Sequence, residues 1–362
     1  MDTNAMRAVG RSRLAVTPLG FGGGTIGSPA IGNEASLATV AAAWETGVRF
    51  YDTAPWYGLG RSERRLGLAL AGLGPRHEFR VNTKIGKTLV PEPVRDEGYK
   101  TFSPGGDVRT PRDPVSGFRV RFEYTEAAVL RQHEDSLQRL GLASVDSLTI
   151  HDIDFGYHSP EQIEVHLDEL SRDGGGGARA LEQLRQAGRI SAIGCGCNLE
   201  SRNAWSWDGG KHEDLCERIA DLVDLDFFVV AGGYTLLETR ALRRILPLAE
   251  DRRIGVVIAA PYASGWLADA SGSATYMYAP APPEVVAKSK RMQAVCEDNG
   301  VPLAAAALQF PLAHPAVATV IPGARSPDEP VANRRNLDTE VPGDVWRRFK
   351  AEGLLDGNAP TP

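Results

Sequence analysis

The sequence lacks three features that would point to a membrane, a secretory route or a nucleic acid. It has no run of about eighteen apolar residues, so we expect no transmembrane helix. Its first residues, MDTNAMRAVGRSRLAV, contain no apolar signal-peptide core, which predicts a cytoplasmic protein. Its 40 lysines and arginines are outnumbered by 46 aspartates and glutamates. Because both signs are spread along the chain without a basic stripe, we expect no nucleic-acid partner.

Cysteine is also scarce, and the four residues of this type are Cys195, Cys197, Cys216 and Cys296. Cys195 and Cys197 are two apart on a predicted strand, so they share one face of it. No CxxC pair and no nearby HxxxH accompanies them, and we therefore expect no zinc or other metal site. The cysteines are interpreted as buried free thiols.

The chain does contain a regular alternation of apolar, strand-like runs with helix-like runs. The predicted strands are residues 16–20, 50–53, 79–85, 147–151, 190–197, 226–231, 254–260 and 316–321. The predicted helices are residues 35–46, 62–72, 125–140, 178–187, 213–222, 239–251, 283–298 and 303–313. Alternation of this kind indicates a parallel sheet, and near-continuously apolar strands indicate a sheet that is covered on both faces.

Eight such units favour an α/β fold of the (β/α)₈ TIM-barrel type as one domain, residues 1–362. The predicted core is residues 15–337, with a C-terminal tail at 338–362 that frays after Leu355. A doubly wound sheet is the structural alternative. Its dinucleotide-binding form needs GxGxxG between a first strand and a helix, and GFGGGTIG at 20–27 does not hold that spacing.

Two irregular segments interrupt the alternation, and they form long loops after the third and seventh strands. Residues 87–123 are polar, contain five prolines and show neither a helical nor a strand period. Residues 266–282, WLADASGSATYMYAPAP, form the second segment. Both follow strands, so both are expected on the C-terminal face of the barrel, where barrel active sites are built.

Four polar side chains stand at or just after successive strand ends. Asp52 ends the second strand, Lys84 the third and His151 the fourth, while Tyr57 follows on the loop that leaves the second. In a barrel these strand ends are neighbours on one rim, so the four groups are expected to converge. Each has a structural alternative on its own: a loop cap for Asp52, a surface position for Lys84, a structural role for His151. Their combination favours a functional site.

The chemistry of this combination is proton transfer to or from an oxygen atom. An unperturbed tyrosine, with a pKa of about 10, is a poor base at neutral pH, but a neighbouring cation favours its phenolate. Lys84 is the candidate cation, and Asp52 can keep it charged and oriented. His151 can donate a hydrogen bond to a substrate oxygen or relay the proton. A phenol that exchanges a proton with an alcohol or carbonyl suits hydride chemistry carried by a cofactor.

The motifs RFYDTAPWYG, NTKIG and IHDID resemble those of the aldo-keto reductase superfamily, over about residues 15–337. The resemblance implies a (β/α)₈ barrel that binds a nicotinamide cofactor, NAD or NADP, without a Rossmann motif. It also implies a catalytic tetrad of Asp52, Tyr57, Lys84 and His151. In it Tyr57 is the acid/base, Lys84 and Asp52 tune it, and His151 orients the substrate oxygen.

Further segments resemble the aldose 1-dehydrogenase branch of that superfamily, which includes fucose, arabinose and galactose dehydrogenases and lies close to pyridoxal 4-dehydrogenase. They include ERRLGLAL, HEDSLQRLG, GCGCN, AGGYTLLE and PYASGWLA. The resemblance implies oxidation of the C1 hydroxyl of a small-molecule sugar to a lactone. An NADPH-dependent aldehyde or ketone reductase, a pyridoxal 4-dehydrogenase-like enzyme and a cofactor-binding regulatory barrel remain as alternatives, and the oligomeric state stays open.

The same resemblance assigns the cofactor and substrate positions. Asn198 corresponds to the residue that binds the carboxamide, and Tyr262 is the candidate to stack on the nicotinamide. Glu329 stands where NADPH-dependent relatives often carry arginine, which favours NAD. The remaining cofactor-binding candidates are Ser264, Gly265 and Leu267 in PYASGWLA and Gly323, Arg325 and Asn333 in the segment for the adenosine end. The aromatic side chains of Trp56, Tyr157, Tyr276 and Tyr278 are candidates to stack on a sugar, or they pack as ordinary loop residues.

Overall fold

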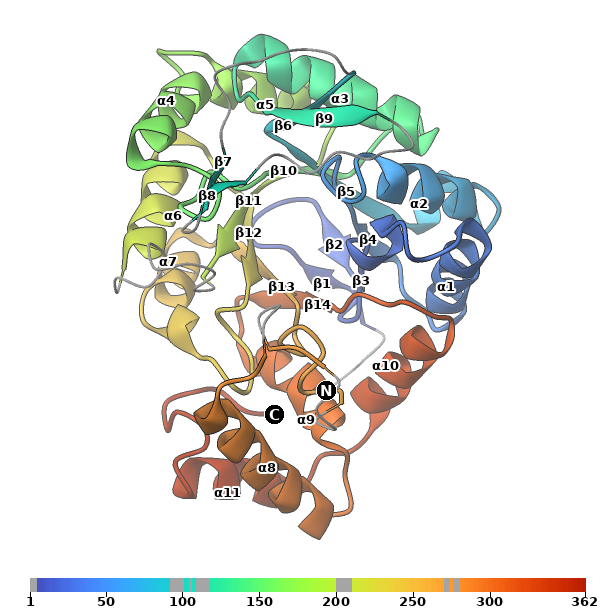
Figure 1. Ribbon diagram of the computed structural model, residues 1–362, viewed down its shortest axis with the longest axis vertical. Helices are drawn as coiled ribbons and strands as arrows, with labels where there is room; N and C mark the ends of the chain where they lie inside the picture. The colour runs from blue at the N-terminus through green and yellow to red at the C-terminus, as the bar shows by residue number, and fades with distance from the viewer. Residues whose placement is uncertain are drawn as a thin grey trace.

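A ring of parallel strands surrounded by helices forms the centre of the computed structural model (Figure 1). The structure describes residues 5–91, 101–103, 106–108, 117–199, 210–269, 274–276 and 280–362. Its eight-stranded sheet has the order β14-β13-β12-β11-β10-β5-β4-β3. In chain order the strands are β3 Phe21–Gly22, β4 Phe50–Asp52, β5 Arg80–Ile85, β10 Ser147–Ile150, β11 Ala192–Asn198, β12 Phe227–Ala231, β13 Gly255–Ala259 and β14 Val317–Ile321.

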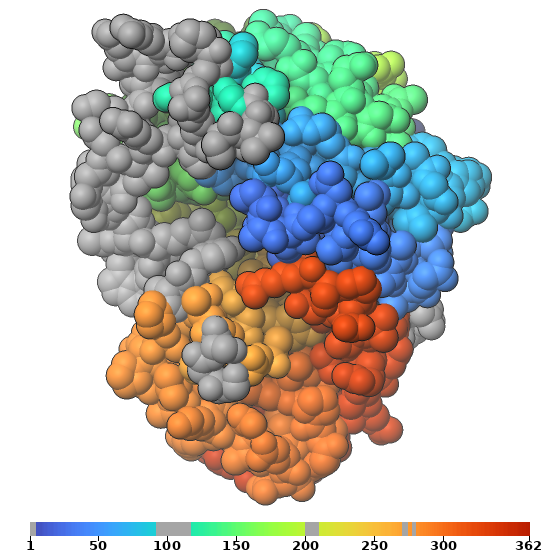
Figure 2. Space-filling model, turned by 45° about the vertical axis from the view of Figure 1, so that its right-hand side comes forward, coloured from blue at the N-terminus to red at the C-terminus, as the bar shows by residue number. Residues whose placement is uncertain are grey.

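The first and last strands of this sheet close on each other. The Gly20 N–H donates to the Val320 carbonyl at 2.9 Å, and the Gly22 N–H donates to the Pro322 carbonyl at 2.9 Å. Parallel bridges join Leu19 to Val320 and Gly22 to Gly323. The space-filling view accordingly shows N-terminal and C-terminal segments side by side on one surface (Figure 2). The predicted (β/α)₈ barrel is therefore confirmed.

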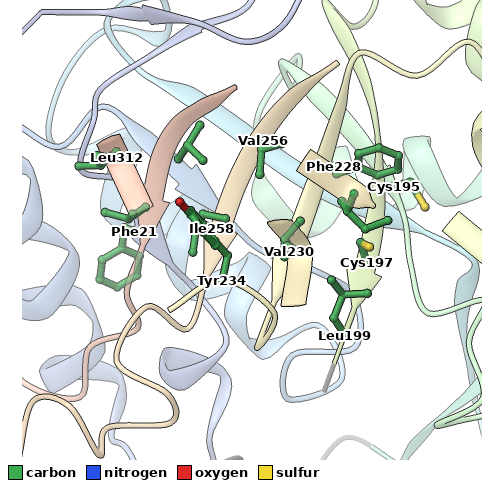
Figure 3. Packing of buried hydrophobic residues seen from close by; sticks show 14 of the residues in the cluster. Phe21, Cys195, Cys197, Leu199, Phe228, Val230, Tyr234, Val256, Ile258 and Leu312 are labelled. Carbon is green, nitrogen blue, oxygen red and sulfur yellow. The ribbon is translucent and has the colours of Figure 1, made fainter. Parts of the chain in front are cut away.

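Successive residues of the barrel strands belong to two different apolar clusters, which explains why the strands are apolar throughout. On β12, Phe227 and Val229 belong to one buried cluster, while Phe228 and Val230 belong to the other. The cluster that contains Phe228 and Val230 also includes Cys195 and Cys197 on β11, and it continues over β12 and β13 (Figure 3). A strand covered on both faces needs no polar alternation, as the sequence indicated.

Helices surround the barrel. They are α1 Asn33–Glu45, α2 Arg61–Ala71, α3 Glu126–Leu140, α4 Pro160–Leu170, α5 Gly177–Gln186, α6 Lys211–Leu222, α7 Ile245–Arg252, α8 Pro283–Asp298, α9 Leu303–Gln309, α10 Asp328–Asp338 and α11 Gly343–Ala351. Short 3₁₀ turns are η1 Thr25–Gly27, η2 Arg76–Glu78, η3 Arg240–Leu242 and η4 Phe310–Ala313. The last barrel helix, α10, packs beside the first, α1 (Figure 1).

The first predicted strand was placed too early. Residues 16–20 do not form the first barrel strand, which is β3 at Phe21–Gly22. Instead, β2 (Ala15–Val16) pairs antiparallel with β1 (Arg7–Ala8). Val9, Leu14 and Val16 from this hairpin share a buried cluster with residues of β12 and β14. The apolar run therefore packs in two places, because its first part forms a hairpin over one end of the barrel and its continuation leads into the first barrel strand.

The long segment after the third strand contains strands, although the sequence predicts neither a helical nor a strand period there. Its two ends, β6 (Lys87–Pro91) and β9 (Phe118–Phe122), pair antiparallel along five residues each. Two shorter strands, β7 (Thr101–Ser103) and β8 (Gly106–Val108), pair inside it. Val120 and Phe122 of β9 are buried in the main apolar cluster, but the prolines and polar residues between the two strands obscure the strand period in the sequence.

Two helical regions also differ from the prediction. Helix α4 was missed, although Ser159 and Gln162 form a reciprocal capping box and Pro160 occupies the first turn, which is a readable start signal. The tail does not fray after Leu355, because Leu354, Leu355 and Ala359 are buried against the main apolar cluster. None of the described helices is both long and apolar enough to cross a membrane.

Candidate active site

A buried ion pair lies at the ends of the second and third barrel strands. Lys84 on β5 donates from Nζ to both carboxylate oxygens of Asp52 on β4, at 2.8 and 2.7 Å. Its third donor reaches the Thr53 carbonyl at 2.9 Å. The side chains of Lys84 and Asp52 are 3% and 4% exposed. Because all three ammonium donors have acceptors, the position of the charge is fixed.

A hydrogen-bond network from β5 and β10 holds the carboxylate of this pair. Asn82, two residues before Lys84 on β5, donates from Nδ2 to Asp52 Oδ1 at 2.6 Å. Its Oδ1 accepts hydrogen bonds from the hydroxyls of Ser147 at 2.8 Å and Thr149 at 3.0 Å on β10. A buried charge is stable only when its polar partners are complete. The network therefore holds the carboxylate in one orientation.

Tyr57 and His151 complete a continuous chain of contacts with this pair. The Lys84 Nζ lies 4.8 Å from the centre of the Tyr57 ring. The Tyr57 and His151 rings meet edge to face, with centroids 5.9 Å apart and an interplanar angle of 87°. A cation so close to a phenol favours its ionised form. The structure thus brings together the four side chains that the sequence singled out.

The backbone of His151 is held from two sides. Its N–H donates to the Ile85 carbonyl at 3.0 Å, and its carbonyl accepts the Tyr124 hydroxyl at 2.6 Å. Tyr124 reaches this point because Gly86 has no side chain: a Cβ on Gly86 would lie 2.2 Å from Cε1 of Tyr124. Gly86 also has φ +107°, a conformation that favours glycine. The glycine after the third strand therefore fixes the residue at the end of the fourth.

A second buried ion pair, which the sequence analysis missed, lies beside the first. Lys87 Nζ contacts Asp152 Oδ2, and the Lys87 side chain is 1% exposed. Burial alone would raise the pKa of Asp152, but the charges of His151 and Lys87, with hydrogen bonds from Lys87 and Asn198, hold this pKa well below its usual range. The available signal was that each residue lies two positions beyond the end of a barrel strand.

Asn198 at the end of β11 is bound by carboxylates of the same region. Its Nδ2 donates to Asp152 Oδ1 at 2.8 Å and to Asp154 Oδ2 at 2.6 Å. With both N–H groups engaged, the amide presents its Oδ1, an acceptor, to any other partner. Such an acceptor is the group that the carboxamide NH₂ of a nicotinamide requires.

The aromatic residues predicted to bind substrate surround Lys87 instead of forming a flat platform. Lys87 Nζ lies 4.1 Å from the Trp56 ring centre and 4.1 Å from the Tyr157 ring centre. The two rings are perpendicular, with centroids 5.7 Å apart. One face of each is therefore used by the protein's own cation. Tyr276 is half-buried between β13 and α8, and Tyr278 lies outside the described residues.

The loop after β13 has an unusual backbone. Ala260, Ala263 and Ser264 all have positive φ, at 52°, 49° and 63°, and Gly265 follows at 102°. Left-handed non-glycine residues are costly and cluster at ligand sites. The buried Ser264 Oγ has no hydrogen-bond partner among the described residues. An unpartnered hydroxyl on a strained loop fits a bound phosphate group, while Leu267, also predicted to bind cofactor, is buried in the core.

Tyr262 links this loop to helix α10. Its hydroxyl donates to Asn333 Oδ1 at 2.9 Å and accepts from Asn336 Nδ2 at 3.4 Å. Burial raises the pKa of Tyr262 to about 12, so this hydroxyl keeps its proton. These bonds place the hydroxyl beside the segment assigned to the adenosine end. They also leave the Asn333 Nδ2 as a donor for an adenine nitrogen.

The start of α10 carries the residues expected to select the cofactor. Glu329 Oε2 accepts the Arg325 N–H at 2.9 Å, and Asp328 adds a second carboxylate to the first turn. Gly323 is bridged to Gly22 at the barrel closure. Carboxylates offset the positive end of a helix dipole that would otherwise attract a phosphate.

Among the described residues, no three His, Cys, Asp or Glu side chains are arranged to hold a metal ion.

Comparisons with known proteins agree with this geometry. The model of the family described as "Aldo/keto reductase family" matches residues 18–352. The chain is 36% identical to pyridoxal 4-dehydrogenase from Microbacterium luteolum, covering 98% of this chain and 99% of that protein. It is 34% identical to D-threo-aldose 1-dehydrogenase from a Pseudomonas species, covering 98% of each. An aldo-keto reductase structure from Bacillus halodurans superposes with a TM-score of 0.66 at 22% identity, covering 97% of this chain and 96% of that one.

Proposed function

We propose that this chain, which belongs to the aldo/keto reductase family and is an NAD(P)-dependent oxidoreductase, oxidises a neutral aldose-type sugar at C1 with NAD. The hydroxyl at C1 of the cyclic sugar becomes the carbonyl of a lactone. The single observation that carries the proposal is the buried Lys84 ammonium, held by Asp52 and placed 4.8 Å from the Tyr57 ring centre.

In this proposal Tyr57 is the base that takes the hydroxyl proton. The Lys84 ammonium stabilises the phenolate of Tyr57, and Asp52 keeps that ammonium in place. His151 orients the substrate oxygen toward Tyr57. The bound nicotinamide supplies the acceptor for the hydride that leaves C1. Proton and hydride therefore leave the same alcohol together, and the substrate loses two electrons.

The charges around the tetrad support a neutral substrate. Lys84 is paired with Asp52, and Lys87 is paired with Asp152. All three donors of the Lys84 ammonium are engaged, and the Lys87 ammonium is buried against a carboxylate, so neither offers an uncompensated charge to a substrate phosphate or carboxylate. A free sugar needs only hydrogen bonds and contact with ring faces, which the outer sides of Trp56 and Tyr157 can supply.

The carboxylates at the start of α10 support NAD over NADP. Glu329 is oriented by its bond to the Arg325 backbone, at the position expected near the adenosine ribose. A carboxylate there accepts hydrogen bonds from ribose hydroxyls and repels a 2′-phosphate. Arg325 is an exposed cation close by, and its side chain is the group that would favour NADP.

Pyridoxal is a second candidate substrate, and the aromatic pair favours it. Trp56 and Tyr157 are half-buried, and an aromatic ring could pack on their outer faces as a sugar could. The relative at 36% identity is named as a pyridoxal 4-dehydrogenase. Pyridoxal, like a free aldose, closes to a cyclic hemiacetal, so the same base and the same hydride transfer would serve both.

The test is nicotinamide reduction by the purified protein with free aldoses, their phosphates, pyridoxal and simple alcohols, each with NAD⁺ and NADP⁺. Turnover of a free aldose with NAD⁺, and none of its phosphate, is the expected result. Turnover of pyridoxal alone would favour the second candidate. Activity confined to NADPH with carbonyl compounds would replace the proposal by a reductase. Cofactor binding without turnover on any substrate would indicate a regulatory barrel.

A further inference from the structure

Asp152 contacts functional groups on both sides of the predicted site. Its Oδ2 meets Lys87 Nζ and lies 3.3 Å from His151 Nε2. Its Oδ1 accepts from Asn198 Nδ2 at 2.8 Å, and its backbone carbonyl lies 3.1 Å from His158 Nε2. One carboxylate thus joins the histidine proposed to orient the substrate to the asparagine proposed to orient the cofactor.

The backbone of Asp152 is built for this position. It has φ +54°, two residues after the fourth barrel strand ends at Ile150. Aspartate and asparagine tolerate the left-handed conformation better than other residues with side chains. At this position two adjacent side chains meet each other, with His151 Nε2 3.3 Å from Asp152 Oδ2.

Lys87 makes a fully ionised carboxylate possible at this depth. A buried carboxylate without a partner would be expensive. Lys87 balances its charge, and the Trp56 and Tyr157 rings, with Phe122 at 5.3 Å, partly replace the water that the ammonium has lost. The pair is neutral overall, so it can direct hydrogen bonds without adding net charge to the site.

We propose that Asp152, held by Lys87, is a positioning residue that sets His151 and Asn198 at the same time. The inference rests on the roles given to those two residues in the proposed function. Its carboxylate keeps a proton on His151 Nε2 and favours the protonated ring. It also fixes the Asn198 amide with its carbonyl oxygen free for a ligand. Substrate and cofactor orientation are then coupled through a single side chain.

The charged groups around His151 determine the sign of the expected effect. Asp152 adjoins it on the loop after β10, Tyr57 faces it from the loop after β4, and the Lys84–Asp52 pair lies beyond Tyr57. Lys87 acts on it through Asp152. Removing the negative charge of Asp152 takes away the nearest group that favours the imidazolium. The titration midpoint of His151 should therefore fall.

The experiment compares Asp152→Asn with Asp154→Asn. The first removes the charge beside His151 without disturbing the left-handed backbone. The second removes the other carboxylate that binds Asn198, two residues further along the chain. Histidine titrations are followed by nuclear magnetic resonance on ¹⁵N-histidine protein without cofactor, and the His151 signal is assigned by its loss in His151→Gln. NADH affinity is measured by fluorescence, and kcat in the substrate assay.

We expect Asp152→Asn to lower the His151 midpoint by about one pH unit, to weaken NADH binding about tenfold and to reduce kcat. Asp154→Asn should weaken NADH binding while leaving the His151 midpoint unchanged. A wild-type His151 midpoint in folded Asp152→Asn would overturn the proposal. So would equal effects of the two variants on every measurement.

If Asp152→Asn does not fold because Lys87 is left buried without its counter-charge, the double variant Lys87→Met/Asp152→Asn removes both charges. It should fold and show the lowered His151 midpoint, and a wild-type midpoint there would also overturn the proposal. A wild-type protein that bound no NADH would defeat the proposed function instead. The His151 titration does not need cofactor, so it would still decide the role of Asp152.

Discussion

Lys84 donates to both carboxylate oxygens of Asp52, at 2.8 and 2.7 Å, from the strand next to the one that Asp52 ends. Its remaining donor is bound by the Thr53 carbonyl at 2.9 Å. The ammonium therefore has a fixed place beside the Tyr57 ring and acts there as a permanent charge. This arrangement makes Tyr57 the group on which the proposed chemistry depends.

Replacing Tyr57 by phenylalanine removes the proposed acid/base and little else. We expect kcat to fall by a factor of about 10² to 10⁴ while NADH still binds. Steady-state kinetics and a fluorescence titration measure the two quantities. Tyr51→Phe is the matched control, because the Tyr51 hydroxyl bonds the Val48 carbonyl inside the core at 3.0 Å. Near-wild-type turnover in Tyr57→Phe would contradict the mechanism.

Replacing Lys84 by methionine should affect stability and activity through different routes. Asp52 would be left buried without its counter-charge, which costs about 3 to 5 kcal/mol of unfolding free energy. The double variant Lys84→Met/Asp52→Asn removes both charges and should recover part of that loss. Its kcat should stay low, because no cation remains beside Tyr57. Denaturant unfolding and kinetics on both variants distinguish the two effects, and recovery of kcat in the double variant would argue against a role for the charge.

The sequence was sufficient for the barrel and for the proximity of the four proposed catalytic side chains, because both depend on strand ends. Apolar runs locate the strands, and parallel strands bring their carboxyl ends to one rim, so Asp52, Lys84 and His151 could be placed together without coordinates. The first strand was misplaced because its apolar run also forms the hairpin that covers the barrel end. Helix α4 was missed although its capping box was legible in the sequence.

The second ion pair could not be predicted in the same way. Asp152 has φ +54°, and its Oδ2 lies 3.3 Å from His151 Nε2; no periodic pattern reveals either feature. Lys87 reads as the start of a polar loop, and it becomes buried because β6 pairs with β9 across a long insertion. Two of the four aromatic residues proposed as a substrate platform, Trp56 and Tyr157, do meet, but their shared contact with Lys87 requires three-dimensional structure.

Cofactor preference should respond to the charge at position 329. Glu329→Arg replaces a carboxylate at the start of α10 with a cation that can bind a 2′-phosphate. We expect the ratio of kcat/KM for NADP⁺ to that for NAD⁺ to rise at least about tenfold. Glu284→Arg makes the same charge change in the first turn of α8 and should leave the ratio unaltered. An unchanged ratio in Glu329→Arg would show that this carboxylate does not face the ribose.

Gly86 should tolerate no side chain. Alanine there would place a Cβ 2.2 Å from Tyr124, whose hydroxyl holds the His151 carbonyl, and would also have to adopt φ +107°. Strain and overpacking together should lower the unfolding free energy by about 3 kcal/mol. Gly188→Ala is the control, since Gly188 has φ +69° with nothing within 4 Å of its added Cβ. Equal losses in the two variants would show that φ alone, and not the contact with Tyr124, sets the cost.

The buried His158 should make the protein less stable in mild acid. Burial, with the nearby charges of His166 and Lys87, lowers the pKa of His158 to about 3, whereas in the unfolded chain it is about 6.5. Below about pH 6.5 the unfolded state binds a proton that the folded state does not, so the free energy of unfolding falls as pH falls toward 3, by up to about 1.4 kcal/mol per pH unit.

His158→Gln should reduce this dependence of the unfolding free energy on pH. His77→Gln, at an exposed position, should not. Urea unfolding of the wild type and both variants at pH 7 and pH 5 measures the differences. Parallel losses in all three proteins would assign the acid sensitivity to groups other than His158.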